Sequence, residues 1–178
     1  MNEPTRRMLE LLGAEGPQVK FEEQLNLYGR FVGSWDLENR YYAPSDGLWR
    51  TESGEWHFGW ILDGYAIQDV IIMPALADKA KPGFPEGGRG TTVRWYDPRL
   101  DAWRVVFFGP AELQFAVLVG HRLGEDIVQE GMAEGGFRLR WVFSEITTER
   151  FRSQGYRSDD DGTTWRLVQE MQARLRTA

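Results

Sequence analysis

Residues 31–42 read Phe-Val-Gly-Ser-Trp-Asp-Leu-Glu-Asn-Arg-Tyr-Tyr, and this stretch decides the fold. Bulky side chains occupy its odd positions, including Trp35 and Leu37, while Asp36 and Glu38 occupy even positions. Successive side chains of a β-strand point to opposite faces, so this period of two predicts a strand with one buried face. The odd positions are therefore expected to point into the core.

Further strand candidates follow, separated by short turn sequences such as Asp63-Gly64 and Gly135-Gly136. Short connectors join neighbouring strands in antiparallel pairs, and such a sheet leaves two exposed edges unless it closes on itself. We therefore predict an all-β fold, an antiparallel up-and-down barrel of about ten strands. The strand candidates lie near residues 31–42, 48–60, 64–74, 90–97, 101–108, 112–121, 125–132, 136–145, 148–157 and 163–175.

The N-terminal segment predicts helices rather than strands. Pro4 suits the first turn of a short helix, and Gly13 suits the position just after its end. A second helical segment is predicted for residues 17–28. Helices this short are marginal in water, so we expect a helical segment at 1–30 that packs on a single barrel domain at 31–178.

The composition describes an acidic, folded chain of one-domain size. Its 178 residues are 42% hydrophobic and 27% charged, which is typical of a globular domain. The net charge of -6 argues against attraction to nucleic acid, and no apolar segment is long enough for membrane insertion. Because the chain has no cysteine, thiolate chemistry and disulfides are excluded, and a reducing cytoplasm is the expected location.

Two strand candidates show clearly which side chains are expected inside. In the second candidate, residues 48–60, one face carries the bulky aromatic side chains of Trp56, Phe58 and Trp60. His57 lies between them and is expected to face solvent or a partner subunit. In the eighth candidate, the same alternation places Trp141 inside.

The strand candidate at 101–108 is apolar on both faces. A two-sided apolar strand implies that something covers its outside, either the N-terminal helices or a second copy of the chain. A homodimer is therefore one of the predicted assemblies.

Several strands place a polar residue where it could face the interior. A buried charge is costly unless it is paired, so interior arginines would have to meet interior glutamates. Such pairs would form either a structural network or the polar end of a binding cavity, and both interpretations stay open. The residues concerned are Gln68, Arg94, Arg104, Glu130, Arg140, Gln154 and Glu170.

Two connectors differ from the short turns. Residues 75–89 are rich in proline and glycine and longer than most loops without a function, so they form either a lid over the barrel mouth or a surface excursion. Three aspartates at 159–161, followed by Gly162, lack the ligand spacing of a calcium loop and predict a hairpin turn.

The motif Gly33-Ser34-Trp35 after a helix, with Arg174 near the end of the last strand, resembles the lipocalins and their calycin relatives. The resemblance implies a lipocalin- or streptavidin-like barrel in which Trp35 packs beneath Arg174, with Arg166 as a less favoured substitute. A narrower resemblance, over residues 29–175, is to a family of uncharacterised bacterial lipocalin-like domains with no agreed activity. The stretches that carry it are Gly59 to Gly64, Ile67 to Val70, Tyr96 to Pro98, Ala102 to Arg104, Arg140 to Phe143 and Trp165 to Leu167.

More distant barrels of this kind supply expectations about ligands. Nitrobindin-like barrels hold haem through a histidine on a late strand, a position that neither His57 nor His121 matches. Fatty-acid-binding-like barrels hold carboxylate tails through interior arginines, which keeps an anionic ligand under consideration. Two histidines cannot build a three-histidine zinc site, so no metal and no cofactor are expected.

We predict that the barrel binds a small apolar or anionic amphipathic molecule. Two alternatives stay open: a barrel enzyme of isomerase, cyclase or hydrolase type with Glu130 and Glu170 as an acid–base pair, and a structural or protein-interaction module with a packed interior. The candidate ligand-binding residues are Trp56, Phe58, Trp60, Gln68, Arg94, Arg104, Glu130, Arg140, Trp141 and Glu170.

Overall fold

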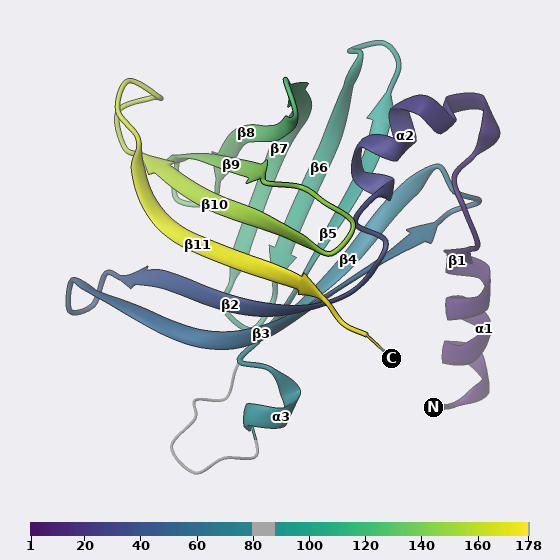
Figure 1. The fold of residues 1–178 in the computed structure, drawn as a ribbon, viewed down its shortest axis with the longest axis horizontal. Helices are drawn as coiled ribbons and strands as arrows, with labels where there is room; N and C mark the ends of the chain where they lie inside the picture. The colour runs from purple at the N-terminus through teal and green to yellow at the C-terminus, as the bar shows by residue number, and fades with distance from the viewer. Residues whose placement is uncertain (80–87, 178) are drawn as a thin grey trace.

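A computed structural model describes residues 1–79 and 88–177, and its central feature is a closed antiparallel barrel (Figure 1). Within these ranges each barrel strand pairs with the next along the chain, and β11 pairs back onto β2. This up-and-down closure confirms the predicted all-β barrel. Its strands are β2 (Gly33–Ala43), β3 (Leu48–Ile61), β4 (Ala66–Met73), β5 (Gly88–Asp97), β6 (Ala102–Gly109), β7 (Gln114–Leu123), β8 (Asp126–Ala133), β9 (Arg138–Ser144), β10 (Arg150–Ser158) and β11 (Arg166–Leu175).

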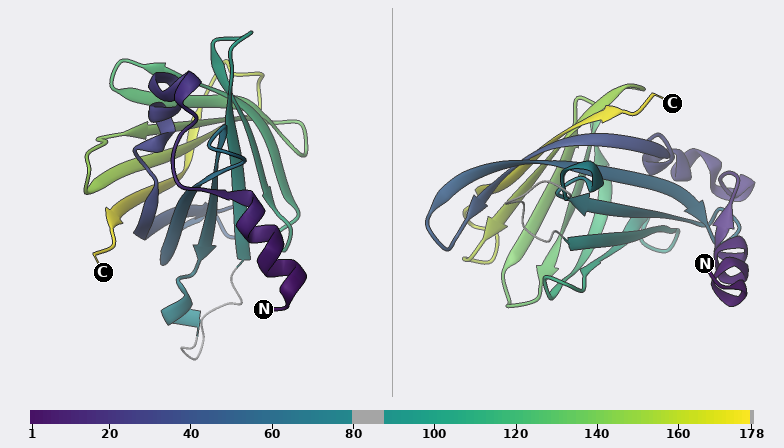
Figure 2. Two further views of the ribbon diagram at one scale, coloured as in Figure 1. Left: turned by 90° about the vertical axis from the view of Figure 1, so that its right-hand side faces the viewer. Right: turned by 90° about the horizontal axis from the view of Figure 1, so that it is seen from below.

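The N-terminal helices differ in how they meet the barrel (Figure 2). α1 (Glu3–Leu12) has no buried residue and continues into β1 (Gly13–Ala14), which pairs with the end of β3. A 3-10 turn (Val19–Phe21) leads into α2 (Glu22–Gly29), which buries three side chains against one end of the barrel. A further helix, α3 (Leu76–Lys79), follows β4. In 1–79 and 88–177 no helix has the length and apolar character needed to cross a membrane.

Aromatic side chains close the end of the barrel beneath α2. Trp35 donates its indole N–H to the backbone carbonyl of Phe31 (2.7 Å), and its ring packs edge-on against Phe151 with centroids 4.8 Å apart. Tyr28 of α2 enters the same cluster and packs on Trp103 at 4.7 Å. All five side chains are buried, so this end of the barrel has a solid core.

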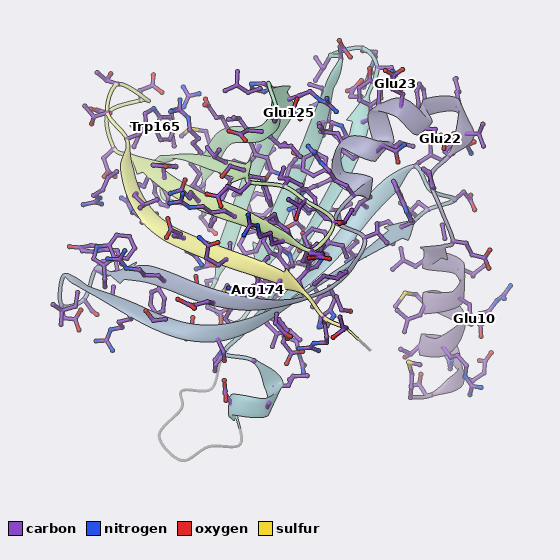
Figure 3. The ribbon with its side chains drawn as sticks, in the orientation of Figure 1. Glu10, Glu22, Glu23, Glu125, Trp165 and Arg174 are labelled. Atoms are coloured by element: carbon purple, nitrogen blue, oxygen red, sulfur yellow. The ribbon has the colours of Figure 1, made fainter. Side chains whose placement is uncertain are left out.

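Trp35 closes this end without the predicted help of Arg174. Arg174, labelled on β11 in Figure 3, lies opposite Asp36 of β2, whereas Leu175 is the residue opposite Trp35. Because neighbouring residues of a strand point to opposite faces, Arg174 lies on the outside and the predicted cap is wrong. Arg166 lies at the far end of β11, so it does not replace Arg174.

The outer face of β6 and β7 is partly apolar, as the two-sided pattern at 101–108 implied. Phe108 and Val117 are exposed there. The N-terminal helices do not cover these residues, because α2 packs on the end of the barrel and α1 buries nothing. The second copy of the chain stays a prediction.

Trp35→Ala is expected to lower the free energy of unfolding by about 3–5 kcal/mol, because it removes a fully buried ring and leaves a cavity. Urea unfolding followed by far-UV circular dichroism measures this loss. Trp49→Ala, on the partly exposed β2–β3 hairpin, is the control and should cost less than about 1 kcal/mol. Equal losses of unfolding free energy in the two variants would show that the aromatic cluster at the closed end is not the main stabilising core.

Candidate functional site

The other half of the barrel encloses a cavity of about 1060 Å³. This is at the upper end of the volumes typical of small-molecule pockets, roughly 300–1,000 Å³. Its lining includes residues of the β2–β3 hairpin and of the loops after β6 and β8, together with Arg157 of β10 and Arg166 of β11. The β2–β3 hairpin lies at the end of the barrel opposite α2 (Figure 1). Trp56, Val105 and Phe143 form its floor on top of the aromatic cluster. Further apolar lining comes from Ile71, Met73, Phe107, Phe115, Ala116, Leu118, Ala133, Phe137, Leu139, Trp141, Val168 and Met171.

One wall of the cavity carries a chain of hydrogen bonds across three strands. Gln169 of β11 donates its Nε2 to Asn39 Oδ1 of β2 (2.9 Å), and Asn39 donates its Nδ2 to Glu52 Oε1 of β3 (2.9 Å). Burial raises the pKa of Glu52, although the hydrogen bond from Asn39 acts in the opposite direction. The wall therefore presents a carboxyl group that binds a proton more readily than an exposed glutamate does.

A buried ion pair lies beside the floor of the cavity. Arg94 of β5 bonds to Asp69 of β4, and their side chains are 2% and 0% exposed. Asp69 Oδ1 also accepts the backbone N–H of Thr92 (3.1 Å). The Arg94 guanidinium carbon lies 5.4 Å from the ring centroid of Tyr28 and 5.7 Å from that of Phe58. The pair brings two opposite charges, and no net charge, into the interior.

Gln129 of β8 connects the cavity floor to α2. Its Nε2 donates to the hydroxyl oxygen of Tyr28 (2.9 Å). This hydroxyl lies so close to β7 that a Cβ added at Gly120 would stand 2.4 Å from it, which explains the glycine there. Burial raises the pKa of Tyr28 to about 12, although Arg94 and the hydrogen bond from Gln129 act in the opposite direction.

The mouth of the cavity separates positive from negative side chains. Arg50 of β3, Arg157 of β10 and Arg166 of β11 line one arc of the rim, and each also reaches an aspartate outside the cavity. Glu112 and Glu134, in the turns after β6 and β8, line another arc. An anionic group of a bound molecule would therefore be favoured on the β3, β10 and β11 side.

The structure divides the ten predicted binding residues into three groups. Trp56, Arg94 and Trp141 line the cavity. Phe58 and Trp60 are buried but lie outside the cavity lining, in the aromatic core beneath it. The remaining five point to the outer face and not to the interior as predicted: Gln68, Arg104, Glu130, Arg140 and Glu170.

Strand alternation explains the outward residues on β8 and β9. Gln129 and Trp141 are opposite each other and face the cavity, so the next pair, Glu130 and Arg140, faces out and forms an ion pair there (2.5 Å). The predicted pairing of arginine with glutamate exists, but outside the barrel. Glu130 does not meet Glu170 as an acid–base pair, because β9 and β10 lie between their strands.

The same alternation accounts for the other outward residues. Gln68 lies opposite Gly59 and donates to a threonine of β5 on the outer face. Arg104 bonds to Asp97 (2.8 Å). Glu170 accepts a hydrogen bond from Gln154 (2.9 Å), so both of these side chains are outside as well.

Sequence reasoning missed several interior polar residues, although signals for two of them were present. Asn39 continues the inward odd positions of residues 31–42. Asp69 shares the parity of the buried Ile67 and Ile71, in a strand where both faces are rich in apolar residues. The missed interior residues are Asn39, Glu52, Asp69, Gln129 and Gln169.

His57 faces outward, as predicted, in a row of polar groups. Its Nδ1 lies 2.9 Å from Ser34 Oγ, and its Nε2 lies 3.3 Å from Glu55 Oε2. Burial alone would raise the pKa of Glu55, but the Leu76 N–H, His57 and Arg176 hold it below its ordinary value. Because none of these residues lines the cavity, we interpret the row as a connection between β2, β3 and the C-terminal segment.

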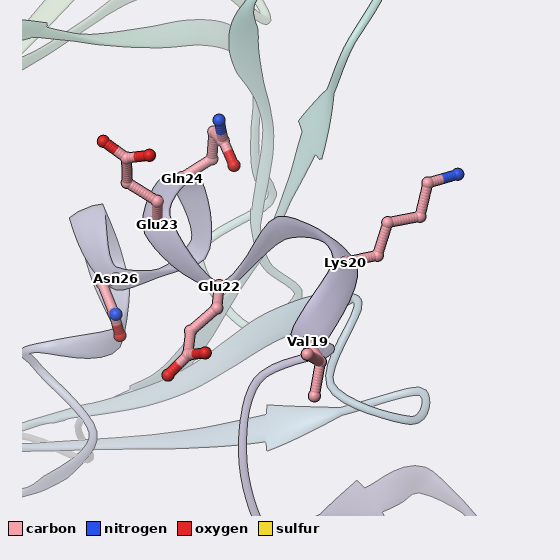
Figure 4. Close-up of a pocket in the computed structure, with 6 residues that line it drawn as sticks. All are labelled: Val19, Lys20, Glu22, Glu23, Gln24 and Asn26. Atoms are coloured by element: carbon pink, nitrogen blue, oxygen red, sulfur yellow. The ribbon is translucent and has the colours of Figure 1, made fainter.

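A second hollow, of about 600 Å³, lies on the outside along the 3-10 turn and α2. Figure 4 shows that its side chains diverge: Lys20 extends away from the helix, while Glu22 and Glu23 lie on different sides of it. Without convergent groups the hollow offers no candidate site. In 1–79 and 88–177 no cluster of three or more His, Cys, Asp or Glu is arranged to hold a metal ion.

The connector at 75–89 joins two strands whose ends lie at the cavity mouth. Met73 before it and Gly88 near its end both line the cavity. Residues 80–87 lie outside the described residues, so the alternative of a lid stays a prediction.

Asp69→Asn is expected to lower the free energy of unfolding by about 3–5 kcal/mol, because it leaves the Arg94 charge buried without its partner. Replacing both, as Asp69→Leu with Arg94→Met, should restore most of that loss. Urea unfolding at neutral pH measures both variants. Asp36→Asn, which removes an exposed partner of Arg176, is the control and should cost less than about 1 kcal/mol. A small loss with Asp69→Asn would contradict the interior pairing.

The raised pKa of Tyr28 predicts a loss of stability in alkali. A tyrosine with a pKa of 10.0 when unfolded and about 12 when folded stabilises the fold fully below pH 10 and loses this contribution as the pH rises toward 12. Between pH 9 and 12 the protein should therefore lose about 2–3 kcal/mol more than Tyr28→Phe does. Tyr65→Phe, at an exposed tyrosine, should behave like the unmodified protein. If the free energy of unfolding falls in parallel with pH in the unmodified protein, Tyr28→Phe and Tyr65→Phe, the pKa of Tyr28 is not raised by folding.

No protein-family model matches this sequence, and a comparison with curated proteins also gives no match. Among solved structures, the S-type phycobiliprotein lyase CPES from Guillardia theta aligns with a TM-score of 0.61. The alignment covers 91% of this chain and 99% of the lyase, with 10% sequence identity. At this identity the likeness is one of fold alone.

Proposed function

We propose that this protein binds a small, largely apolar molecule inside its barrel and holds an anionic group of that molecule at the mouth. The observation that carries the proposal is the cavity of about 1060 Å³, closed at one end by aromatic side chains and open at the other. Protein interiors without a ligand are normally filled by side chains to high density. The cavity therefore favours a ligand-binding barrel over a packed structural module.

The lining of the cavity has the chemistry of a site for an amphipathic molecule. Apolar and aromatic side chains form most of the surface, and a few fixed polar groups interrupt it. At the rim, the guanidinium carbon of Arg157 lies 3.9 Å from the ring centroid of Phe137. The guanidinium carbon of Arg166 lies 5.6 Å from the ring centroid of Tyr42. Stacked guanidinium groups lose little freedom when they bind a carboxylate or sulfonate, so they support an anionic group at this position.

The shared fold supports the same class of ligand. The neighbour is a phycobiliprotein lyase. We therefore include a bilin among the probes, because a bilin has a long apolar body and carboxylates. The alternative of a barrel enzyme loses the acid–base pair predicted for it, because Glu130 and Glu170 lie outside the barrel in separate ion pairs.

Ala133→Trp tests binding inside the barrel, because the new ring would extend into the cavity near its mouth. We expect it to weaken binding of 1-anilinonaphthalene-8-sulfonate by about tenfold or more, measured by fluorescence titration. Val117→Trp on the neighbouring strand adds the same ring to the outer face, and it should leave the affinity unchanged.

Circular dichroism of both variants checks that the barrel is intact. Equal affinities in both variants would place the dye on the surface and contradict the proposal. The absence of any binding to the unmodified protein, by the dye and by a bilin alike, would overturn it.

A further inference from the structure

The polar wall of the cavity leaves hydrogen-bond acceptors free at both of its ends. Glu52 and Gln169 line the cavity and are half-buried. Among the described residues, no donor reaches Glu52 Oε2 or Gln169 Oε1. Both oxygens keep accessible surface, in contrast to the fully buried polar atoms that lack a partner. The wall therefore offers acceptors, and not donors, to a bound molecule.

The direction of the hydrogen-bond chain explains this polarity. A carboxylate accepts hydrogen bonds and donates none, so Asn39 turns its amide nitrogen to Glu52. The amide oxygen of Asn39 is then left for Gln169, which contributes its own amide nitrogen. Because Asn39 is only 1% exposed, its position between these two neighbours is fixed. One carboxylate thus sets the polarity of the wall across β3, β2 and β11.

Glu52 has no counter-ion of its own. It makes no ion pair within residues 1–79 and 88–177, and Arg50, two residues away on the same strand, pairs with Asp46. Burial raises the pKa of Glu52, and among the described residues only the hydrogen bond from Asn39 acts against this shift. A half-buried carboxylate in a largely apolar cavity is costly unless an opposite charge pairs with it. The group that fits this position is a cation.

We propose that Glu52 binds a protonated amine of the ligand inside the cavity. An ammonium group supplies both the positive charge that Glu52 lacks and an N–H donor for its free oxygen. Asn39 positions the carboxylate, and Gln169 positions Asn39. The inference rests on the proposed binding inside the barrel and names one more functional group of the ligand. With its anionic group at the arginine rim, the ligand is a zwitterionic amphiphile.

Three probes with the same aromatic body test this: 1-naphthylmethylamine, 1-naphthalenemethanol and 1-naphthylacetate, titrated at pH 8 by isothermal titration calorimetry. The first is a cation with N–H donors, the second a neutral donor and the third an anion. We expect the amine to bind about tenfold more tightly than the alcohol, as one hydrogen bond to a charged group allows. Glu52→Gln should abolish this preference, because it removes the negative charge but keeps an oxygen for Asn39.

Glu38→Gln is the matched control. Glu38 precedes Asn39 on β2 and is exposed, so alternation places it on the outer face of the barrel. The variant removes the same charge from the protein without changing the cavity, and it should keep the preference for the amine. Circular dichroism checks that both variants are folded, and the order of the three affinities in the unmodified protein tests the inference without any variant.

The outcomes separate the inference from the proposed function. Equal affinities for the amine and the alcohol in the unmodified protein would overturn the inference and leave binding inside the barrel intact. A preference for the amine that survives in Glu52→Gln would also overturn it, because another group would then hold the cation. Binding of 1-naphthylacetate alone would support the arginine rim and overturn the amine site. If none of the probes binds the unmodified protein, the proposed function fails and the inference fails with it.

Discussion

The aromatic closure beneath α2 is the constraint on which the rest of the structure depends. A ten-stranded barrel is too wide for its own side chains to fill evenly, so the core has to be concentrated somewhere. Here Trp35 is fixed by its hydrogen bond to the Phe31 carbonyl and packs on Phe151, while Tyr28 packs on Trp103 in the same core cluster. Because one end holds the strands together, the other end can stay open around a cavity.

The polar groups in the interior follow from that division. Arg94 and Asp69 lie next to the packed end, where burial forces them to pair. Gln129 satisfies the hydroxyl of Tyr28, and this bond connects β8 to the helix that closes the barrel. The polarity of the floor is therefore partly a consequence of how the barrel is closed.

The candidate site could be predicted from the sequence where a strand has one clearly apolar face. Residues 48–60 alternate without ambiguity, so the sequence predicts correctly that Trp56 lies inside and His57 outside. On β6 and β8 both faces carry apolar residues, so the sequence of either strand alone does not show which face points into the barrel. For that reason the predicted interior positions of Arg104 and Glu130 are wrong, and both residues form ion pairs on the outer face.

The sequence by itself determined the strands, their antiparallel order and the closure of the barrel, because alternation and short turns are local properties of the chain. Only the tertiary structure decided which of the charged residues share the interior. The pairing of Arg94 with Asp69 depends on the register between β4 and β5, and the corrected position of Arg174 depends on the register between β11 and β2. A shift of one residue exchanges the two faces of a strand, so the side chains in the cavity are set by pairing across strands and not by local pattern.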